Sequence, residues 1–237
     1  MTISTHLLAA TIGILFPLYL ILTHKKDINK LENEEGFRKT YYKRLIFIFW
    51  SLASLVLANS MVEDSYKLNF DPTFNTIGLT ALVLISLFII ALIYTSGINS
   101  MEKVHSIQRK LKDITHFLPT SKAEYYWFNL LSISAGICEE VIFRLFMFSY
   151  FLHQFNLWIA FILTNVFFAL THFDTQKQNM MNSFLLGLLF SGIYHFSQNI
   201  WLAILLHIII DVHIGYLGFN VNKFIENNPP ELNPSNE

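Results

Sequence analysis

Long apolar runs separated by short polar segments dominate this chain. A helix needs about 20 predominantly apolar residues to cross the hydrocarbon core of a bilayer, and about seven runs reach or approach that length. The runs cover residues 7–23, 45–62, 76–97, 125–152, 157–171, 181–196 and 200–219. The pattern predicts an all-α fold, a polytopic bundle of about seven transmembrane helices in which the shorter runs are tilted or re-entrant.

One polar segment has a helical pattern of its own. Apolar residues recur at steps of three and four from Met101 to Leu118, with Lys and Arg between them. This periodicity predicts a basic amphipathic interfacial helix on the cytoplasmic leaflet, with packing against the bundle as the alternative. Pro119 ends the segment, and Ser121 with Glu124 forms a capping-box pattern that starts the next helix.

Composition and charge support a membrane protein. The chain is 53% hydrophobic and 14% charged, with a mean hydropathy of +0.44, whereas soluble domains carry about 25% charged residues. Twelve of the 16 Lys and Arg residues lie in the loops after the first and third runs. Those loops are therefore predicted to be cytoplasmic. No basic stripe typical of nucleic-acid binding is present, and the single cysteine, Cys138, excludes an internal disulfide.

These patterns divide the chain into three parts. Residues 1–120 hold the first spans and the amphipathic helix, residues 121–219 hold a second group of apolar runs, and residues 220–237 read as a flexible tail with three prolines. We expect a multi-pass protein of the cell membrane that has lipid as its surroundings. A bacterial plasma membrane is the favoured location.

Six ionisable residues within the second group of runs, or at the end of one, form a candidate set; His195, near a span end, and His213, which points elsewhere on its helix, are left out. Each costs roughly 2.5–3.5 kcal/mol on insertion scales, so such residues are functional candidates by default. Helical spacing predicts an ion pair between Glu140 and Arg144, which are four residues apart. It places the adjacent carboxylate of Glu139 about 100° away around the helix, without a local partner. The six are Glu139, Glu140, Arg144, His172, His207 and Asp211, with Glu140 and Arg144 as the pair.

Depth along the spans brings these residues together. From an aromatic belt at Tyr125–Trp127 the helical rise places Glu139 about 18 Å into the bilayer. From an opposite belt at Trp158 and Trp201, His207 lies about 9 Å deep, Asp211 about 15 Å and His172 about 21 Å. In a hydrocarbon core about 30 Å thick, Glu139, His207 and Asp211 are thus predicted to lie at one level, with His172 somewhat deeper.

Two kinds of chemistry suit this set. A carboxylate and histidines can position and deprotonate a water for attack on a peptide carbonyl. Alternatively, Glu139, His172 and His207 could bind Zn²⁺ with one coordination position open. The residues alone leave the metal and the metal-free mechanisms open.

The same residues resemble the motifs of a known family. Glu139-Glu140-x-x-x-Arg144, Phe168-x-x-x-His172 and His207-x-x-x-Asp211 are similar, in this order, to three motifs of the CPBP intramembrane endopeptidases, which include CAAX prenyl endopeptidases and Abi-type bacteriocin-processing and self-immunity proteins. The resemblance covers roughly residues 121–219. It implies a CPBP-like catalytic bundle and an endopeptidase whose substrate is a membrane-associated peptide or protein.

The resemblance also implies roles for the residues. Glu139 would be the general base with His172 as its partner, and Glu140 with Arg144 would hold the site. His207 and Asp211 would bind a metal or stabilise the oxyanion. The third motif ends in Asp211 where prenyl endopeptidases more often have Asn, which favours the metal-ligand or self-immunity interpretation. The alternatives are a non-catalytic membrane scaffold or immunity protein and a proton-coupled transporter, for which no repeated halves are visible.

Overall fold

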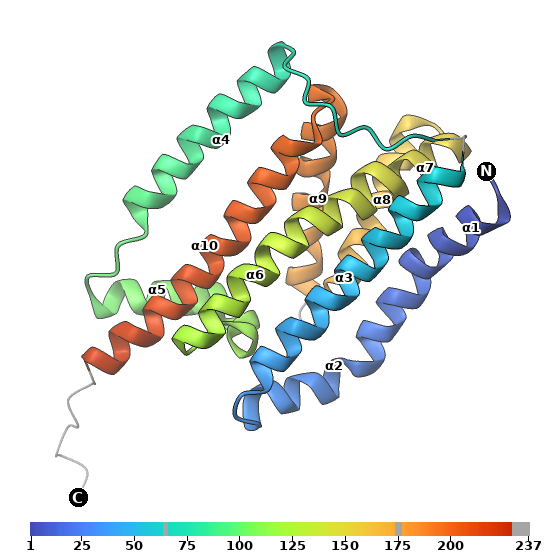
Figure 1. Cartoon of the computed structure of the whole chain (residues 1–237). Coiled ribbons are helices and arrows are strands. Elements are labelled where there is room, and N and C mark those ends of the chain that lie inside the picture. Colours follow the sequence, from blue (N-terminus) through green and yellow to red (C-terminus); the bar gives the residue numbers. More distant parts are fainter. Residues whose placement is uncertain (64–65, 174–176, 229–237) are drawn as a thin grey trace, which may run out of the picture.

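The computed structural model describes residues 1–63, 66–173 and 177–228, and within these ranges it is helical without strands. The helices form a bundle whose long members run up and down its length (Figure 1). Their order along the chain is α1 (Ile3–Ala10), η1 (Thr11–Leu15), α2 (Phe16–Asn33), α3 (Phe37–Val62), α4 (Thr76–Thr95), α5 (Met101–Leu111), η2 (Lys112–Phe117), α6 (Lys122–Glu139), η3 (Glu140–Met147), α7 (Phe148–Gln154), α8 (Leu157–Thr171), α9 (Lys177–Ser197) and α10 (Ile200–Asn227).

Each predicted apolar run coincides with a helix or a continuous helical stretch. Within the described residues, four helical segments are long and apolar enough to cross a membrane, namely Ile3–Asn33, Phe37–Val62, Thr76–Thr95 and Ile200–Asn227. The helix Leu157–Thr171 is apolar but shorter, and α6, η3 and α7 follow one another without a break. The predicted all-α multi-pass bundle is confirmed: the chain is a multi-pass membrane protein.

The amphipathic segment lies across one end of the bundle (Figure 1). Its helix α5 ends at Leu111, earlier than predicted, and a 3₁₀ turn follows in η2. The apolar face of α5 packs on α10, where Val104 and Ile107 form a buried cluster with Val221. Helix α5 therefore packs against the bundle, which was the alternative prediction. Its basic residues Arg109 and Lys110 are exposed. We call this end, with α5 and the α2–α3 connection, the basic end.

One core joins the first and second predicted parts of the chain. The main buried cluster runs from Leu8 in α1 to Ile204 in α10. Tyr42 of α3 packs edge-on against Phe128, which lies beyond residue 120. The N-terminal helices therefore form one wall of the same bundle that holds the ionisable residues.

The flexible tail was predicted to begin at residue 220, which is too early in the chain. Helix α10 continues to Asn227, past the predicted end at Phe219. Val221 accounts for this extension, because its burial against α5 stabilises the last turns of the helix. The remainder of the predicted tail, residues 229–237, lies outside the described residues.

The start of α6 follows its sequence signal. The side chain of Ser121 accepts a hydrogen bond from the backbone of Glu124, and the carboxylate of Glu124 accepts one from the backbone of Ser121. This reciprocal capping box is confirmed, and it fixes the helix that carries Glu139 at its other end.

Candidate active site

The site begins where an α-helix widens. Helix α6 ends at Glu139, and Glu140–Met147 continue it as a π-helix in which all eight residues are buried. A π turn is wider than an α turn, and such turns often occur at functional sites. The widening reduces the angle between neighbouring side chains, so that Glu139 and Glu140 both reach α10. Spacing alone had separated these two carboxylates.

His207 of α10 lies between the two carboxylates. Its Nδ1 is 2.7 Å from Glu140 Oε1, and because a carboxylate accepts, the imidazole donates this bond. Its Nε2 is 3.8 Å from Glu139 Oε2 and 3.6 Å from Asp211 Oδ2. The His207 side chain is 6% exposed and that of Asp211 is 32% exposed. The imidazole is thus fixed on one side and faces two acidic groups on the other.

Arg144 pairs with Glu140, as the spacing predicted. Its Nε lies 3.2 Å from Glu140 Oε2, and both side chains are fully buried. The contact is an ion pair without an aligned hydrogen bond, because both atoms lack a hydrogen-bond partner among the described residues. A buried charge needs a partner to offset its desolvation. Glu140 therefore neutralises Arg144 with one oxygen and orients His207 with the other.

His172 comes from the C-terminal end of α8. Its Nδ1 lies 3.0 Å from the carbonyl oxygen of Phe168 and 3.2 Å from Thr171 Oγ1. A carbonyl oxygen only accepts hydrogen bonds, so Nδ1 carries a proton and Nε2 faces the site. That Nε2 is 3.9 Å from Glu139 Oε2. The hydroxyl of Thr171 also donates to Phe168, which closes a small network that sets the ring.

A close approach of α6 and α10 makes this meeting possible. A Cβ added to Gly136 would lie 2.5 Å from Ile208 Cγ1 and 3.1 Å from the backbone nitrogen of Ile208. Gly136 is one turn before the glutamates, and Ile208 follows His207. Only a residue without a side chain lets the α10 backbone come this near.

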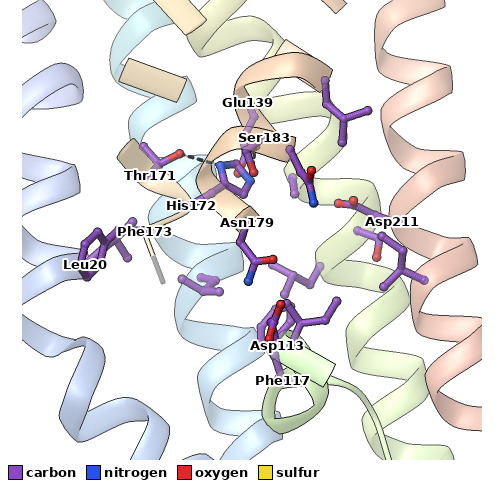
Figure 2. A pocket seen from close by; sticks show the side chains of 18 of the residues that line it. Leu20, Asp113, Phe117, Glu139, Thr171, His172, Phe173, Asn179, Ser183 and Asp211 are labelled. Atoms are coloured by element: carbon purple, nitrogen blue, oxygen red, sulfur yellow. Dashed lines mark hydrogen bonds and ion pairs between the residues drawn. The ribbon is translucent and has the colours of Figure 1, made fainter. Parts of the chain in front are cut away.

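The six predicted residues converge around Glu139. One of its carboxylate oxygens, Oε2, is buried and has no hydrogen-bond partner among the described residues, although both imidazoles face it. It lines a cavity of about 470 Å³ together with His172, His207 and Asp211. Figure 2 shows this cavity with Glu139, His172 and Asp211 around one part and Asp113 and Phe117 at another. A buried polar atom without a partner beside a cavity is a place for a water or a polar substrate group.

Polar residues near the basic end also line the cavity. They are His24, Asp27, Asp113 and His116. The sequence pattern did not identify His24 and His116 as cavity residues, because both lie near span ends. Their location became visible only when the fold brought α2 and η2 against the same space. Asp27 is buried and paired with Arg44 at 2.5 Å.

The metal hypothesis can be compared with the placement of the side chains. Among the described residues, no three or more His, Cys, Asp or Glu side chains form a group that could hold a metal ion as they stand. The predicted set of Glu139, His172 and His207 therefore does not fit zinc in this arrangement. Glu139 Oε2 lies 3.8 and 3.9 Å from the two imidazole nitrogens, beyond direct hydrogen-bond distance. The chemistry below is accordingly derived from the side chains alone.

Comparison with known proteins agrees with this geometry. Residues 121–213 match the family described as type II CAAX prenyl endopeptidase Rce1-like. This part of the chain is similar to that family. The matched residues contain the helices that supply all six ionisable side chains, so the resemblance noted in the sequence is confirmed. The family match covers less than half of the chain.

A curated relative extends the similarity. The chain is 27% identical over 160 residues to the Bacillus subtilis (strain 168) protein named "Putative membrane peptidase YdiL". The aligned part covers 67% of this chain and 65% of that relative. No solved structure matches the chain significantly. The part of the chain that is similar to this family thus contains the ionisable residues described above.

Proposed function

We propose that this protein is an intramembrane endopeptidase that hydrolyses a peptide bond of a membrane-associated protein or peptide. The observation that carries the proposal is the unpartnered Oε2 of Glu139, which lies between two imidazoles at a cavity within the bundle. The Rce1-like match and the peptidase-named relative support the same reaction class.

The proposed first step is activation of a water by Glu139. A water between Glu139 Oε2 and His172 Nε2 has an acceptor on each side, because Nδ1 of His172 carries the ring proton. Glu139 removes one proton as the water oxygen attacks the carbonyl carbon. General-base catalysis of this kind contributes roughly 10²–10⁴-fold.

The other residues are proposed to act on the developing negative charge. An imidazole whose Nδ1–H is held by Glu140 can carry a second proton on Nε2 and donate it to the oxyanion. Asp211, 3.6 Å from that nitrogen, orients the ring from the opposite side. Glu139 then returns its proton to the amide nitrogen, so that the C–N bond breaks into a carboxylic acid and an amine, and the acid passes its proton to the amine to leave a carboxylate and an ammonium group. Preorganised donors of this kind are commonly the largest catalytic contribution.

The test is cleavage of a candidate peptide by the reconstituted protein. Wild type is compared with Glu139→Ala and His172→Ala, with the thermal unfolding midpoint of each as the control for folding. Loss of product in both variants supports the proposal, and equal rates in all three proteins contradict it. A chelator followed by added zinc, in the same assay, distinguishes a metal-dependent reaction from the metal-free one.

The substrate class can be tested with the same preparation. Prenylated CAAX-type peptides and bacteriocin-type leader peptides represent the two branches of the resembled family. We propose a processing or self-immunity role as the finer alternative, because Asp211 stands where prenyl endopeptidases more often have Asn. Faster cleavage of leader peptides would support that role, and cleavage of prenylated peptides alone would contradict it.

A further inference from the structure

Outside the six predicted residues, a polar contact joins α8 to α9 beside the site. Asn165 is fully buried and Ser191 is 1% exposed. Asn165 Nδ2 donates to Ser191 Oγ at 3.1 Å, and Ser191 Oγ lies 3.3 Å from Asn165 Oδ1 in the reciprocal direction. The same amide donates to the carbonyl of Phe161 at 2.8 Å. Buried hydrogen bonds of this kind fix helices relative to one another in a membrane.

Gly187 lets this contact form. It precedes Ser191 by one turn on α9, so both residues lie on one face. A Cβ added to Gly187 would clash with Asn165 Oδ1 and stand 3.0 Å from Phe168 Cδ1. The absence of a side chain therefore allows Asn165 to lie against the backbone of α9.

The carbonyl of Gly187 connects this contact to the site. It accepts a hydrogen bond of 3.2 Å from the Nη2 of Arg144. The guanidinium also lies 4.3 Å from the ring centroid of Phe168 and 5.4 Å from that of Phe190. Phe190 in turn stacks on the imidazole of His207, with centroids 4.9 Å apart and planes 14° apart. Arg144, Glu140 and His207 form a series of contacts. Helix α9 thus contacts Arg144 at one end of this series through the Gly187 carbonyl, and His207 at the other end through the Phe190 ring.

We propose that Asn165, Gly187 and Ser191 form a clasp that positions Arg144 and, through Glu140 and Phe190, the imidazole of His207. None of the three touches the reacting atoms, so they are positioning residues. The inference rests on the proposed function for its kinetic consequences, but the orientation of His207 can be observed without catalysis. Displacement of α9 would move the Gly187 carbonyl and the Phe190 ring together, and so would change both contacts that hold the series.

The first test is Gly187→Ala with Gly192→Ala as the matched control. Gly192 is on the same helix, and no described atom outside the local helix lies within 4 Å of a Cβ added there. In ¹⁵N-histidine NMR of the full-length protein in detergent, with His207 assigned by its substitution, we expect Gly187→Ala to shift the Nδ1 and Nε2 signals of His207. Gly192→Ala should leave them unchanged. Unchanged His207 signals in Gly187→Ala would overturn the clasp.

The second test measures kcat and KM of Gly187→Ala and of a double variant. We expect Gly187→Ala to lower kcat by roughly 10- to 100-fold with KM within about twofold, because displacement of an ångström from productive geometry costs about that much. Adding Asn165→Ala removes the clashing oxygen together with the hydrogen bonds of the clasp, so the double variant should have the kcat of Asn165→Ala alone. A double variant with a kcat well below that of Asn165→Ala would contradict the clasp.

Ser191→Ala covers the case in which Gly187→Ala does not fold. It removes the reciprocal hydrogen bonds without introducing a clash, and we expect a kcat about 2- to 10-fold lower at unchanged KM, with a shifted His207 signal. A wild-type kcat and an unchanged spectrum would overturn the inference. If wild type cleaves no peptide, the proposed peptidase fails, while the NMR comparison still decides the clasp.

Discussion

Gly136→Ala tests whether the close approach of α6 and α10 assembles the site. The added methyl would lie 3.1 Å from the backbone nitrogen of Ile208 and 2.5 Å from its Cγ1, where ordinary contact begins at 3.4 Å. The nitrogen cannot rotate away, so the two helices must separate by roughly 0.3 Å, and by up to roughly 0.9 Å if the Ile208 side chain does not move.

The expected rate follows from that displacement. If about 1 Å costs a factor of about 100 and the logarithm of the rate falls linearly with distance, kcat drops roughly 4- to 60-fold. Overpacking costs about 1–3 kcal/mol, partly offset by the gain of up to about 1 kcal/mol when Gly becomes Ala within a helix. A net loss of at most about 3 kcal/mol is smaller than a typical folding free energy of about 5–15 kcal/mol, so the variant should remain folded.

The assay is peptide cleavage in proteoliposomes, with thermal unfolding in detergent as the folding measure. Gly192→Ala is the control, since it makes the same chemical change in another helix without a close described neighbour. A Gly136→Ala variant that retains the wild-type kcat would refute the reasoning, and so would an equal loss of kcat in Gly192→Ala.

Three further predictions concern residues that hold the bundle. Arg144→Leu leaves Glu140 buried without its cation and should destabilise the fold by about 3–5 kcal/mol in thermal or denaturant unfolding; wild-type stability would contradict the ion pair's role. Glu124→Ala removes the capping box and should cost about 1 kcal/mol, and an unchanged unfolding midpoint would contradict it. Burial, with a smaller effect of the Glu63 charge, raises the pKa of Tyr66 from 10.0 to about 12. The stability from neutral Tyr66 is therefore complete below pH 10 and lost as pH rises toward 12, a decline that Tyr66→Phe should remove in unfolding measured across that range.

The sequence was sufficient for the long helices and for the convergence of the ionisable residues. Apolar run length identified the long helices, and the three- and four-residue periodicity identified α5. Depth estimates brought Glu139, His207 and Asp211 to one level, and the ion-pair distances agree with that convergence. These inferences succeeded because helical rise and the thickness of a bilayer constrain depth independently of how the helices pack.

Local packing was beyond the sequence. An ideal α-helix separates Glu139 from Glu140, whereas the π turn brings both to His207. The clasp at Asn165 depends on which helices become neighbours, and residue spacing within one helix carries no such information. The cavity positions of His24 and His116 were missed for the same reason, since α2 and η2 come together only in the folded bundle.

The central claim is that Glu139 activates the water that hydrolyses a peptide bond. The most direct measurement is the rate of product formation from a membrane-associated peptide by purified wild type and by Glu139→Gln, which preserves the shape of the side chain. The account predicts cleavage by wild type and a rate lower by roughly 10²–10⁴-fold in the variant at equal thermal stability. A Glu139→Gln variant that cleaves at the wild-type rate would contradict it.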